Sequence, residues 1–205
     1  MKTAITIHAL AAALGALGSA SAQAADGTLD PTFGAGGVAY MALDGVEGHQ
    51  LAPRAMSVQH DGRIVLGGWR NKIIAGTPDP RMRAMVARLR PDGSPDATFG
   101  ADPALPGLSV LPDLVVGTQM QWVEAMRVND DGSLYVAGSC FAFGPMHGFI
   151  AKVRADGTLD TAFGDGGVVL FRGLQLHDMG VDSQGRVVAA GEHVGGTPQY
   201  RGVVV

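Results

Sequence analysis

The chain has 205 residues, a formal net charge of −4 and a single cysteine, Cys140. A mildly acidic chain is a poor candidate for binding a phosphate backbone, and one cysteine cannot form an intrachain disulfide. The 31 glycines and 11 prolines fall in short groups between apolar runs, which is typical of a turn-rich β protein.

Residues 1–24 are predicted to be a secretory signal peptide. Lys2 precedes an apolar run over residues 4–17, and small residues lead to Ala22-Gln23-Ala24. This order is typical of a signal peptide cut after Ala24, and the run is too short for a comfortable membrane span of about 20 residues. A retained membrane anchor is the competing interpretation. We expect the mature chain, without a membrane span, in the periplasm or outside the cell.

Residues 25–205 are predicted to form one repeat domain with three repeats, approximately 26–91, 92–155 and 156–205. Each repeat opens with an Asp-Gly pair, a second Asp four residues after the first, and a Phe-Gly pair. The opening segments read DGTLDPTFGAGG from Asp26, DGSPDATFG from Asp92 and DGTLDTAFGDGG from Asp156. Self-similarity at a fixed period is the signature of a repeat architecture.

The second block of each repeat predicts a β-hairpin. Apolar residues alternate with polar or small ones on both sides of a turn, as in half-buried strands. Glycine takes the positive φ of a tight turn without steric cost, and the predicted turns are Asp61-Gly62, Asp131-Gly132 and Gln184-Gly185. Each hairpin has an apolar pair in its first strand: Met56 and Val58, Met126 and Val128, Met179 and Val181.

Two further strands complete each repeat, one after the Phe-Gly pair and one before the next Asp-Gly pair. In the latter strand, Met85, Ala87 and Leu89 share one face, as do their equivalents Phe149, Ala151 and Val153. Residues 201–205 align with 83–87, in the middle of this strand.

The expected fold class is all-β: tandem four-stranded antiparallel blades, β-propeller-like, in three repeats. Closed propellers usually have about four to eight blades. Three alternatives therefore stay open: a truncated product, a ring completed by two or more chains, or an open arc with exposed edges.

These motifs resemble the delta-60 repeat family of bacterial secreted proteins, whose consensus runs close to G-x-L-D-x-x-F-G-x-x-G followed by D-G-R-I-x-V-x-G. The first repeat matches with DGTLDPTFGAGG and HDGRIVLGG, and the third with DGTLDTAFGDGG and SQGRVVAAG. The second departs over residues 101–106, where we expect an offset or irregular first strand. The resemblance implies a propeller-type fold and export. It implies no catalytic residues, because the family's function is largely unassigned.

The repeated aspartates Asp30, Asp96 and Asp160 are the first candidate site, since carboxylates beside glycine turns suit Ca²⁺. The favoured interpretation is structural: each caps its own turn by accepting hydrogen bonds from nearby amides. Residues 129–132 read NDDG but lack the spacing and the final Glu of an EF-hand loop. We therefore assign no metal-binding or cofactor-binding residue and expect no cofactor.

No motif of a common hydrolase or nucleotide-binding protein occurs, neither GxSxG nor GxxxxGK(S/T). The histidines of the mature chain show no metal-ligand spacing; they are His49, His60, His147, His177 and His193. The pair His177-Asp178 breaks the repeat pattern, because Asp178 stands where the other repeats have Ala55 and Ala125. It is either a functional pair or sequence drift.

Two tryptophans, Trp69 and Trp122, lie beside the variable loops 70–81 and 111–121. They either stack on a sugar or peptide or cover the rim of the core. Cys140 is expected to be a small core hydrophobe.

Repetition without a convergent catalytic set predicts a secreted, non-enzymatic scaffold whose loops bind a protein or a glycan. Two alternatives stay open. One is a propeller-based hydrolase or lyase using His177 or Asp178, and the other is a truncated repeat fragment without independent function. No residue is assigned as catalytic.

Overall fold

The computed structural model describes residues 27–41, 49–74, 77–194 and 202–204, and the predicted signal peptide lies outside the described residues. The described regular structure is entirely β. Its strands are β1 (His49–Val58), β2 (Ile64–Ile74), β3 (Thr77–Leu89), β4 (Leu108–Val110), β5 (Met120–Val128), β6 (Leu134–Phe141), β7 (Met146–Val153), β8 (Val168–Arg172), β9 (Leu174–Val181), β10 (Val187–His193) and β11 (Gly202–Val204). In this part of the chain, no helix is long and apolar enough to cross a membrane.

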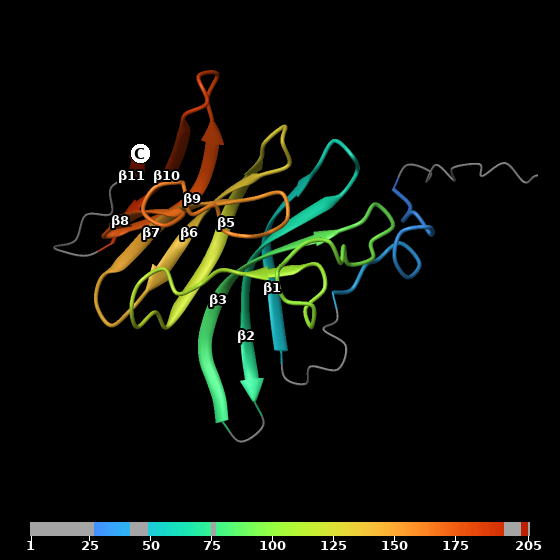
Figure 1. Cartoon of the computed structure of the whole chain (residues 1–205), viewed down its shortest axis with the longest axis horizontal. Helices are drawn as coiled ribbons and strands as arrows, with labels where there is room; N and C mark the ends of the chain where they lie inside the picture. Colours follow the sequence, from blue (N-terminus) through green and yellow to red (C-terminus); the bar gives the residue numbers. More distant parts are fainter. Residues whose placement is uncertain (1–26, 42–48, 75–76, 195–201, 205) are drawn as a thin grey trace, which may run out of the picture.

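The strands form three antiparallel blades. Blade 1 contains β1–β4, blade 2 contains β5–β8, and blade 3 contains β9–β11. Strand pairing between β3 and β5 is limited to a parallel bridge at Met82 and Met120. Figure 1 shows the blades side by side in an arc that does not close, with their hairpin tips pointing the same way. The fold class predicted from the sequence is therefore confirmed, and the described part of the chain is an open array.

The blades are out of phase with the sequence repeats. Strand β4 follows the pair Phe99-Gly100 of the second repeat, yet it pairs with β3 of the first. Strand β8 follows Phe163-Gly164 and pairs with β7 of the preceding repeat in the same way. The strand after each of these Phe-Gly pairs thus completes the blade before it.

The departure of the second repeat over residues 101–106 has the expected effect on its first strand. Strand β8 begins four residues after Gly164, whereas β4 begins eight residues after Gly100 and is only 3 residues long. The extra residues form successive turns closed by the amides of Leu105 and Leu108. Leu105 is buried in a cluster with Met85 and Ala87 of β3.

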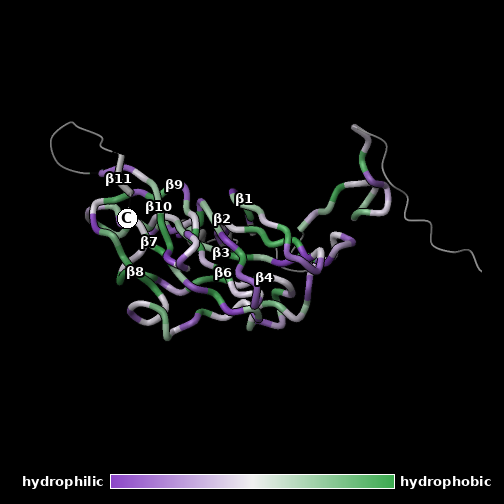
Figure 2. Tube along the Cα trace, turned by 90° about the horizontal axis from the view of Figure 1, so that it is seen from above, coloured by the Kyte–Doolittle hydropathy of each residue, from purple (hydrophilic) through white to green (hydrophobic). Residues whose placement is uncertain are grey.

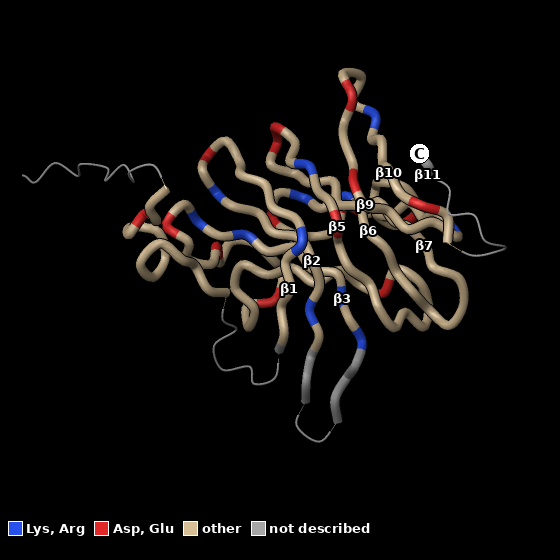
Figure 3. The backbone as a smooth tube through the Cα atoms, turned by 180° about the vertical axis from the view of Figure 1, so that it is seen from behind, with Lys and Arg blue, Asp and Glu red and all other residues tan. Residues whose placement is uncertain are grey.

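Each hairpin has the predicted glycine turn. The φ angles of Gly62, Gly132 and Gly185 are 80°, 79° and 76°, a region that other residues adopt only with strain. In the first turn, the amide of Gly62 donates to the carbonyl of Gln59 at 2.9 Å, and the amide of Gln59 donates to the carbonyl of Arg63 at 2.8 Å. Figure 3 shows acidic residues at these tips.

A β-bulge interrupts the first strand of every hairpin, at Arg54, Glu124 and His177. A glycine lies on the partner strand beside each bulge, and these glycines are Gly68, Gly138 and Gly191. A Cβ on any of them would lie 1.9 to 2.0 Å from a carbonyl oxygen of the bulged strand. The close backbone approach explains why glycine recurs at this position.

The blades stack face to face. Between blades 1 and 2, Val65 and Val86 pack in one cluster with Met126, Val136 and Phe149. We call the face of a blade that meets the preceding blade its leading face, and the opposite face its trailing face. Met126 thus lies on the leading face of blade 2, and Val65 lies on the trailing face of blade 1.

A second cluster joins the trailing face of blade 2 to the leading face of blade 3, with Ala137 and Ile150 packed near Leu176 and Met179. The residues of β7 alternate as predicted, yet both of its faces are buried, because a blade lies on each side. Phe149 on one face is 0% exposed and Ile150 on the other is 4% exposed.

The leading face of blade 1 differs from its equivalents. Met126 and Met179 are each 3% exposed, but Met56 is 67% exposed and Val58 is 59% exposed. The prediction of a half-buried strand is wrong at Met56 and Val58, because no described blade packs against them. It is also wrong at Val181, which is 39% exposed at the end of β9.

Candidate functional site

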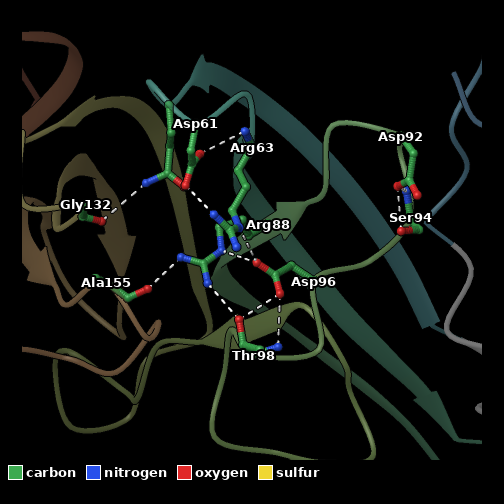
Figure 4. Close-up of polar contacts among 10 residues, drawn as sticks. Asp61, Arg63, Arg88, Asp92, Ser94, Asp96, Thr98, Gly132 and Ala155 are labelled. Atoms are coloured by element: carbon green, nitrogen blue, oxygen red, sulfur yellow. Dashed lines mark hydrogen bonds and ion pairs between the residues drawn. The ribbon is translucent and has the colours of Figure 1, made fainter. Parts of the chain in front are cut away.

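The most extensive polar cluster surrounds Asp96, whose side chain is only 2% exposed (Figure 4). Its Oδ2 accepts hydrogen bonds from Nε of Arg88 at 2.8 Å and Nε of Arg63 at 2.9 Å. Its Oδ1 accepts bonds from the backbone amide of Thr98 at 3.1 Å and from that residue's hydroxyl at 2.7 Å. Every oxygen of this carboxylate is therefore engaged within the protein.

Arg88 connects this cluster to the end of the next repeat. Its Nη1 donates to the carbonyl of Ala155 at 2.6 Å, and its guanidinium carbon lies 4.7 Å from the centre of the Phe99 ring. Burial alone would raise the pKa of Asp96, but the bonds from Thr98 and the charge of Arg88 outweigh it and lower that pKa to about 2. The cluster is a structural joint between strands and repeats.

The repeated aspartates act as turn caps, as predicted. Oδ1 of Asp30 accepts the amide of Thr32 at 2.9 Å, and Oδ1 of Asp160 accepts the amide of Ala162 at 3.4 Å. Asp160 also pairs with Lys152 at 3.7 Å. Cationic side chains beside Asp96 and Asp160 oppose the alternative interpretation of a calcium site, because they compete for the carboxylate charge.

Residues 129–132 form an ordinary hairpin turn. Oδ1 of Asp131 accepts the amide of Ser133 at 2.9 Å and its hydroxyl at 2.6 Å, and these bonds lower the pKa of Asp131. Among the described residues, no three His, Cys, Asp or Glu side chains are grouped so that they could hold a metal ion.

His177 and Asp178 do not converge on one cavity. Nε2 of His177 lies 3.4 Å from Oε1 of Glu192, and Oδ1 of Asp178 accepts the amide of Met179 at 2.7 Å. Asp178 lines a shallow depression on the trailing face of blade 3, and His177 is not part of its lining. The geometry offers this pair no shared substrate position.

The other candidate histidines are scattered over the blades. His49 begins β1, His147 lies in β7, and His193 ends β10. The side chain of His60 is 92% exposed in a hairpin turn, 3.7 Å from Asp130.

Trp122 covers the rim of the core. It is 9% exposed, and its Nε1 donates to Oε1 of Glu124 at 2.6 Å. Trp69 is half-buried in β2. Cys140 is a core residue as predicted: it is 0% exposed, and burial raises its thiol pKa to about 11.

A groove of about 400 Å³ lies between residues 112–114 and residues 165–170. Its apolar lining includes Leu114, Leu159 and Leu170, and Asp113 and Asp165 supply carboxylates. One wall of this groove lies in the variable loop 111–121, which the sequence marks as irregular. The other wall could not be found from the sequence, because it comes from the following repeat.

The arrangement defines the class of protein: an all-β domain built from propeller-type repeats whose blades stack on one another. A family model described as "Domain of unknown function (DUF5122) beta-propeller" matches residues 59–99 and 130–163. Both matches run from the hairpin turn to the phenylalanine of the next Phe-Gly pair, so they cover the same segment of successive repeats. The match supports the propeller-type repeat, while the delta-60 resemblance stays a prediction. No curated protein matches the chain.

Proposed function

We propose that this protein is an exported, non-enzymatic scaffold that binds a partner protein through the groove between residues 112–114 and 165–170. The observation that carries the proposal is the contrast between a carboxylate of the groove and that of the charged cluster around Asp96. The carboxylate of Asp96 is satisfied by side chains of the blades, whereas Asp165 lines an open surface. Asp113, on the other wall of the groove, is paired with Arg83 at 2.9 Å.

The chemistry of the groove favours a peptide over a glycan. Its lining is aliphatic, without an aromatic ring on which a sugar could stack. Strand β8 forms part of its wall, and Leu170 in that strand is 43% exposed. An extended peptide can lie along such a strand, with a Lys or Arg side chain facing the carboxylate of Asp165.

Binding is tested with defined probes. A fluorescent peptide of alternating Val and Lys is titrated with the purified protein, and chitotetraose serves as the glycan probe. We expect peptide binding that Asp165→Ala weakens about tenfold, which corresponds to about 1.4 kcal/mol. Asp130→Ala is the matched control, since it removes the same charge from a fully exposed hairpin turn. Tight binding of chitotetraose with no binding of the peptide would contradict the proposed partner class.

The enzyme alternative requires turnover. The protein is incubated with peptidoglycan, polysaccharide and casein, and products are measured for the parent chain, His177→Gln and Asp178→Asn. We expect no product, because these two side chains share no cavity. Turnover that either substitution abolishes would replace the scaffold proposal with a hydrolase or lyase.

Export is part of the same proposal. Removal of residues 1–24 predicts Ala25 as the first residue of protein recovered from the periplasm or the medium. N-terminal sequencing tests this, and protein retained in the membrane with Met1 intact would contradict it.

A further inference from the structure

No described strand completes blade 3 in the way that β4 and β8 complete blades 1 and 2. In those blades the fourth strand is β4 or β8, which belongs to the following sequence repeat. Strand β11 pairs with β10 on one side, and no described strand lies on its other side. Such an edge presents unpaired amide and carbonyl groups to any strand that can reach it.

The first sequence repeat contains the corresponding strand, and this strand has no sheet to join. Residues 38–41 follow Phe33-Gly34 just as β8 follows Phe163-Gly164. They belong to no described strand, and the exposed fractions of Val38 and Tyr40 are 37% and 76%.

The loop that leads into residues 38–41 already has the geometry of the loop before β8. The amide of Ala35 donates to the carbonyl of Val38 at 2.8 Å, and the amide of Asp165 donates to the carbonyl of Val168 at the same distance. Residues 38–41 are therefore held as a fourth strand would be, next to the leading face of blade 1, where Met41 packs.

The leading face of blade 1 is the second unmatched surface. Met56 and Val58 are exposed, as is Pro53 beside the bulge. Five of their six equivalents are buried or half-buried against the preceding blade: Val123, Met126 and Val128 in blade 2, Leu176 and Met179 in blade 3. The sixth, Val181, is 39% exposed. The methyl carbon of Met126 fills the space where Gly67 lacks a side chain, 2.5 Å from the position of a Cβ. Met56 has no such surface beneath it.

The trailing face of blade 3 is the complementary surface. Val188 is 37% exposed, whereas its equivalent Val65 in blade 1 is 0% exposed. Ala190 is exposed, although its equivalents Gly67 and Ala137 lie under the methionine-bearing face of the next blade. The trailing face of blade 3 is therefore an exposed surface on which the leading face of one more blade can pack.

A backbone contact that joins successive repeats also lacks a partner in the third repeat, among the residues that the structure describes. The amide of Gly34 donates to the carbonyl of Asp92, and the amide of Gly100 donates to that of Asp156, both at 2.8 Å. The third amide in this series, that of Gly164, has no corresponding acceptor among the described residues.

The glycines of the Asp-Gly pairs show the other half of this contact. Cβ positions built on Gly93 and Gly157 lie 3.1 and 3.0 Å from the rings of Phe33 and Phe99. Gly27, the first of the series, has nothing within 4 Å of its Cβ position. Gly27 therefore lacks a Phe-Gly turn of a preceding repeat against it, and the turn at Gly164 lacks the Asp-Gly pair of a following repeat.

We infer that a second copy of this chain supplies the missing partners at both ends. Residues 38–40 of each chain pair with β11 of the other, with Tyr40 opposite Val203 and Ala39 opposite Val204. The leading face of blade 1 in one chain packs on the trailing face of blade 3 in the other, and Met56 contacts Ala190.

The register follows from blade 2. There Leu170 lies opposite Phe149, and Phe149 lies opposite Gly138. Val203 lies opposite Gly191, the equivalent of Gly138. Because Tyr40 is the equivalent of Leu170, it falls opposite Val203.

The three described blades are fewer than the about four to eight of a closed propeller, and two copies of this array bring six together. Figures 1 and 2 place residues 27–41 and blade 3 at opposite ends of the array, so one chain does not close on itself. Two copies in a head-to-tail ring make two identical interfaces and leave no face of a blade uncovered.

Charge favours the same contact. Arg54 and Glu124, the bulge residues of blades 1 and 2, pair at 2.7 Å between the blades. The next bulge residue is His177, and its neighbour Asp178 has a side chain that is 74% exposed. Within the chain, Asp178 lies 4.0 Å from Arg127. In the ring, Arg54 of the second copy approaches the same carboxylate as a second cation.

This inference does not rest on the proposed function, and its test is the molar mass of the purified protein by light scattering after gel filtration. We expect a dimer at micromolar concentration that Met56→Glu converts into a folded monomer. Val116→Glu is the control, since Val116 is 98% exposed in a loop and its replacement should leave the dimer intact. Circular dichroism of Met56→Glu shows whether the monomer keeps its β structure.

Cross-linking tests the head-to-tail geometry. Met56→Cys and Ala190→Cys chains are treated with a short bismaleimide, separately and mixed. A cross-link formed only in the mixture supports the ring. A monomeric parent chain, a series of larger open species, insoluble protein, or cross-linking of Met56→Cys alone would each overturn it.

Discussion

The interface between blades 1 and 2 and the two free ends of the array use the same repeat positions with opposite outcomes. At the interface, Met126 and Val136 are 3% and 0% exposed, and the trailing face opposite is equally covered. At the ends, Met56 and Val188 are 67% and 37% exposed. The difference teaches that burial in this protein depends on the neighbouring blade. The same apolar position of the repeat is buried where a blade packs on it and exposed where none does.

The largest effect we predict comes from truncating one methionine in the two environments. Met126→Ala should lower the free energy of unfolding by about 2–5 kcal/mol, because it opens a cavity between blades. Met56→Ala should change the stability of the isolated subunit by less than about 0.5 kcal/mol. Urea denaturation of dilute protein measures both. Equal losses would show that Met56 is covered within a single chain.

The bulge glycines should be nearly as sensitive. Gly138→Ala places a methyl group against the carbonyl oxygen of Trp122, and we expect a loss of about 3 kcal/mol, at the upper end of overpacking costs. Gly180→Ala is the control, because nothing lies within 4 Å of its Cβ position. Thermal unfolding compares the two, and an unchanged melting temperature for Gly138→Ala would mean that the bulge is not held as described.

Asp96→Asn tests the polar joint between repeats. The folded pKa of Asp96 is about 2, below the ordinary 3.8, so ionisation contributes about 2 kcal/mol at neutral pH, at 1.36 kcal/mol per unit. Since the folded pKa is lowered, this stability is present above about pH 4 and is lost as the pH falls towards 2.

Urea titrations of the parent and Asp96→Asn chains from pH 7 to pH 2 check this prediction. The two stabilities should converge at the acid end. Curves that stay parallel would show that the carboxylate charge contributes nothing to the joint.

The smallest effect belongs to the ion pair between Arg54 and Glu124. Arg54 has a side chain that is 46% exposed, and exposed pairs contribute about 0.2–1 kcal/mol. Arg54→Ala should therefore cost the isolated subunit about 0.5 kcal/mol and become milder at high salt. A loss several times larger in dilute protein would place this pair among the main stabilising contacts between blades.

Local features were predictable from the sequence because neighbouring residues determine them. The turns at Gly62 and Gly132, the cap at Asp96 and the burial of Cys140 all follow from residue type and alternation. Strand partnership is not local. Residues 108–110 read as a strand of the second repeat, but nothing in the sequence shows that they pair with the first.

The candidate sites show the same division. Alternation along residues 85–89 puts Arg88 on the face opposite Met85, yet its burial depends on the next repeat, whose Ala155 carbonyl it reaches. The groove near Asp165 likewise needs two segments about 50 residues apart. His177 and Asp178 were singled out because they broke the repeat, and a break in pattern did not by itself predict a shared cavity.

Hydrogen exchange at residues 38–40 tests the central claim most directly, because these amides gain a partner strand only when a second copy is present. The account predicts slow exchange of this segment in the parent chain at micromolar concentration and fast exchange in Met56→Glu, with β6 protected in both. Equally fast exchange of residues 38–40 in both proteins would contradict it.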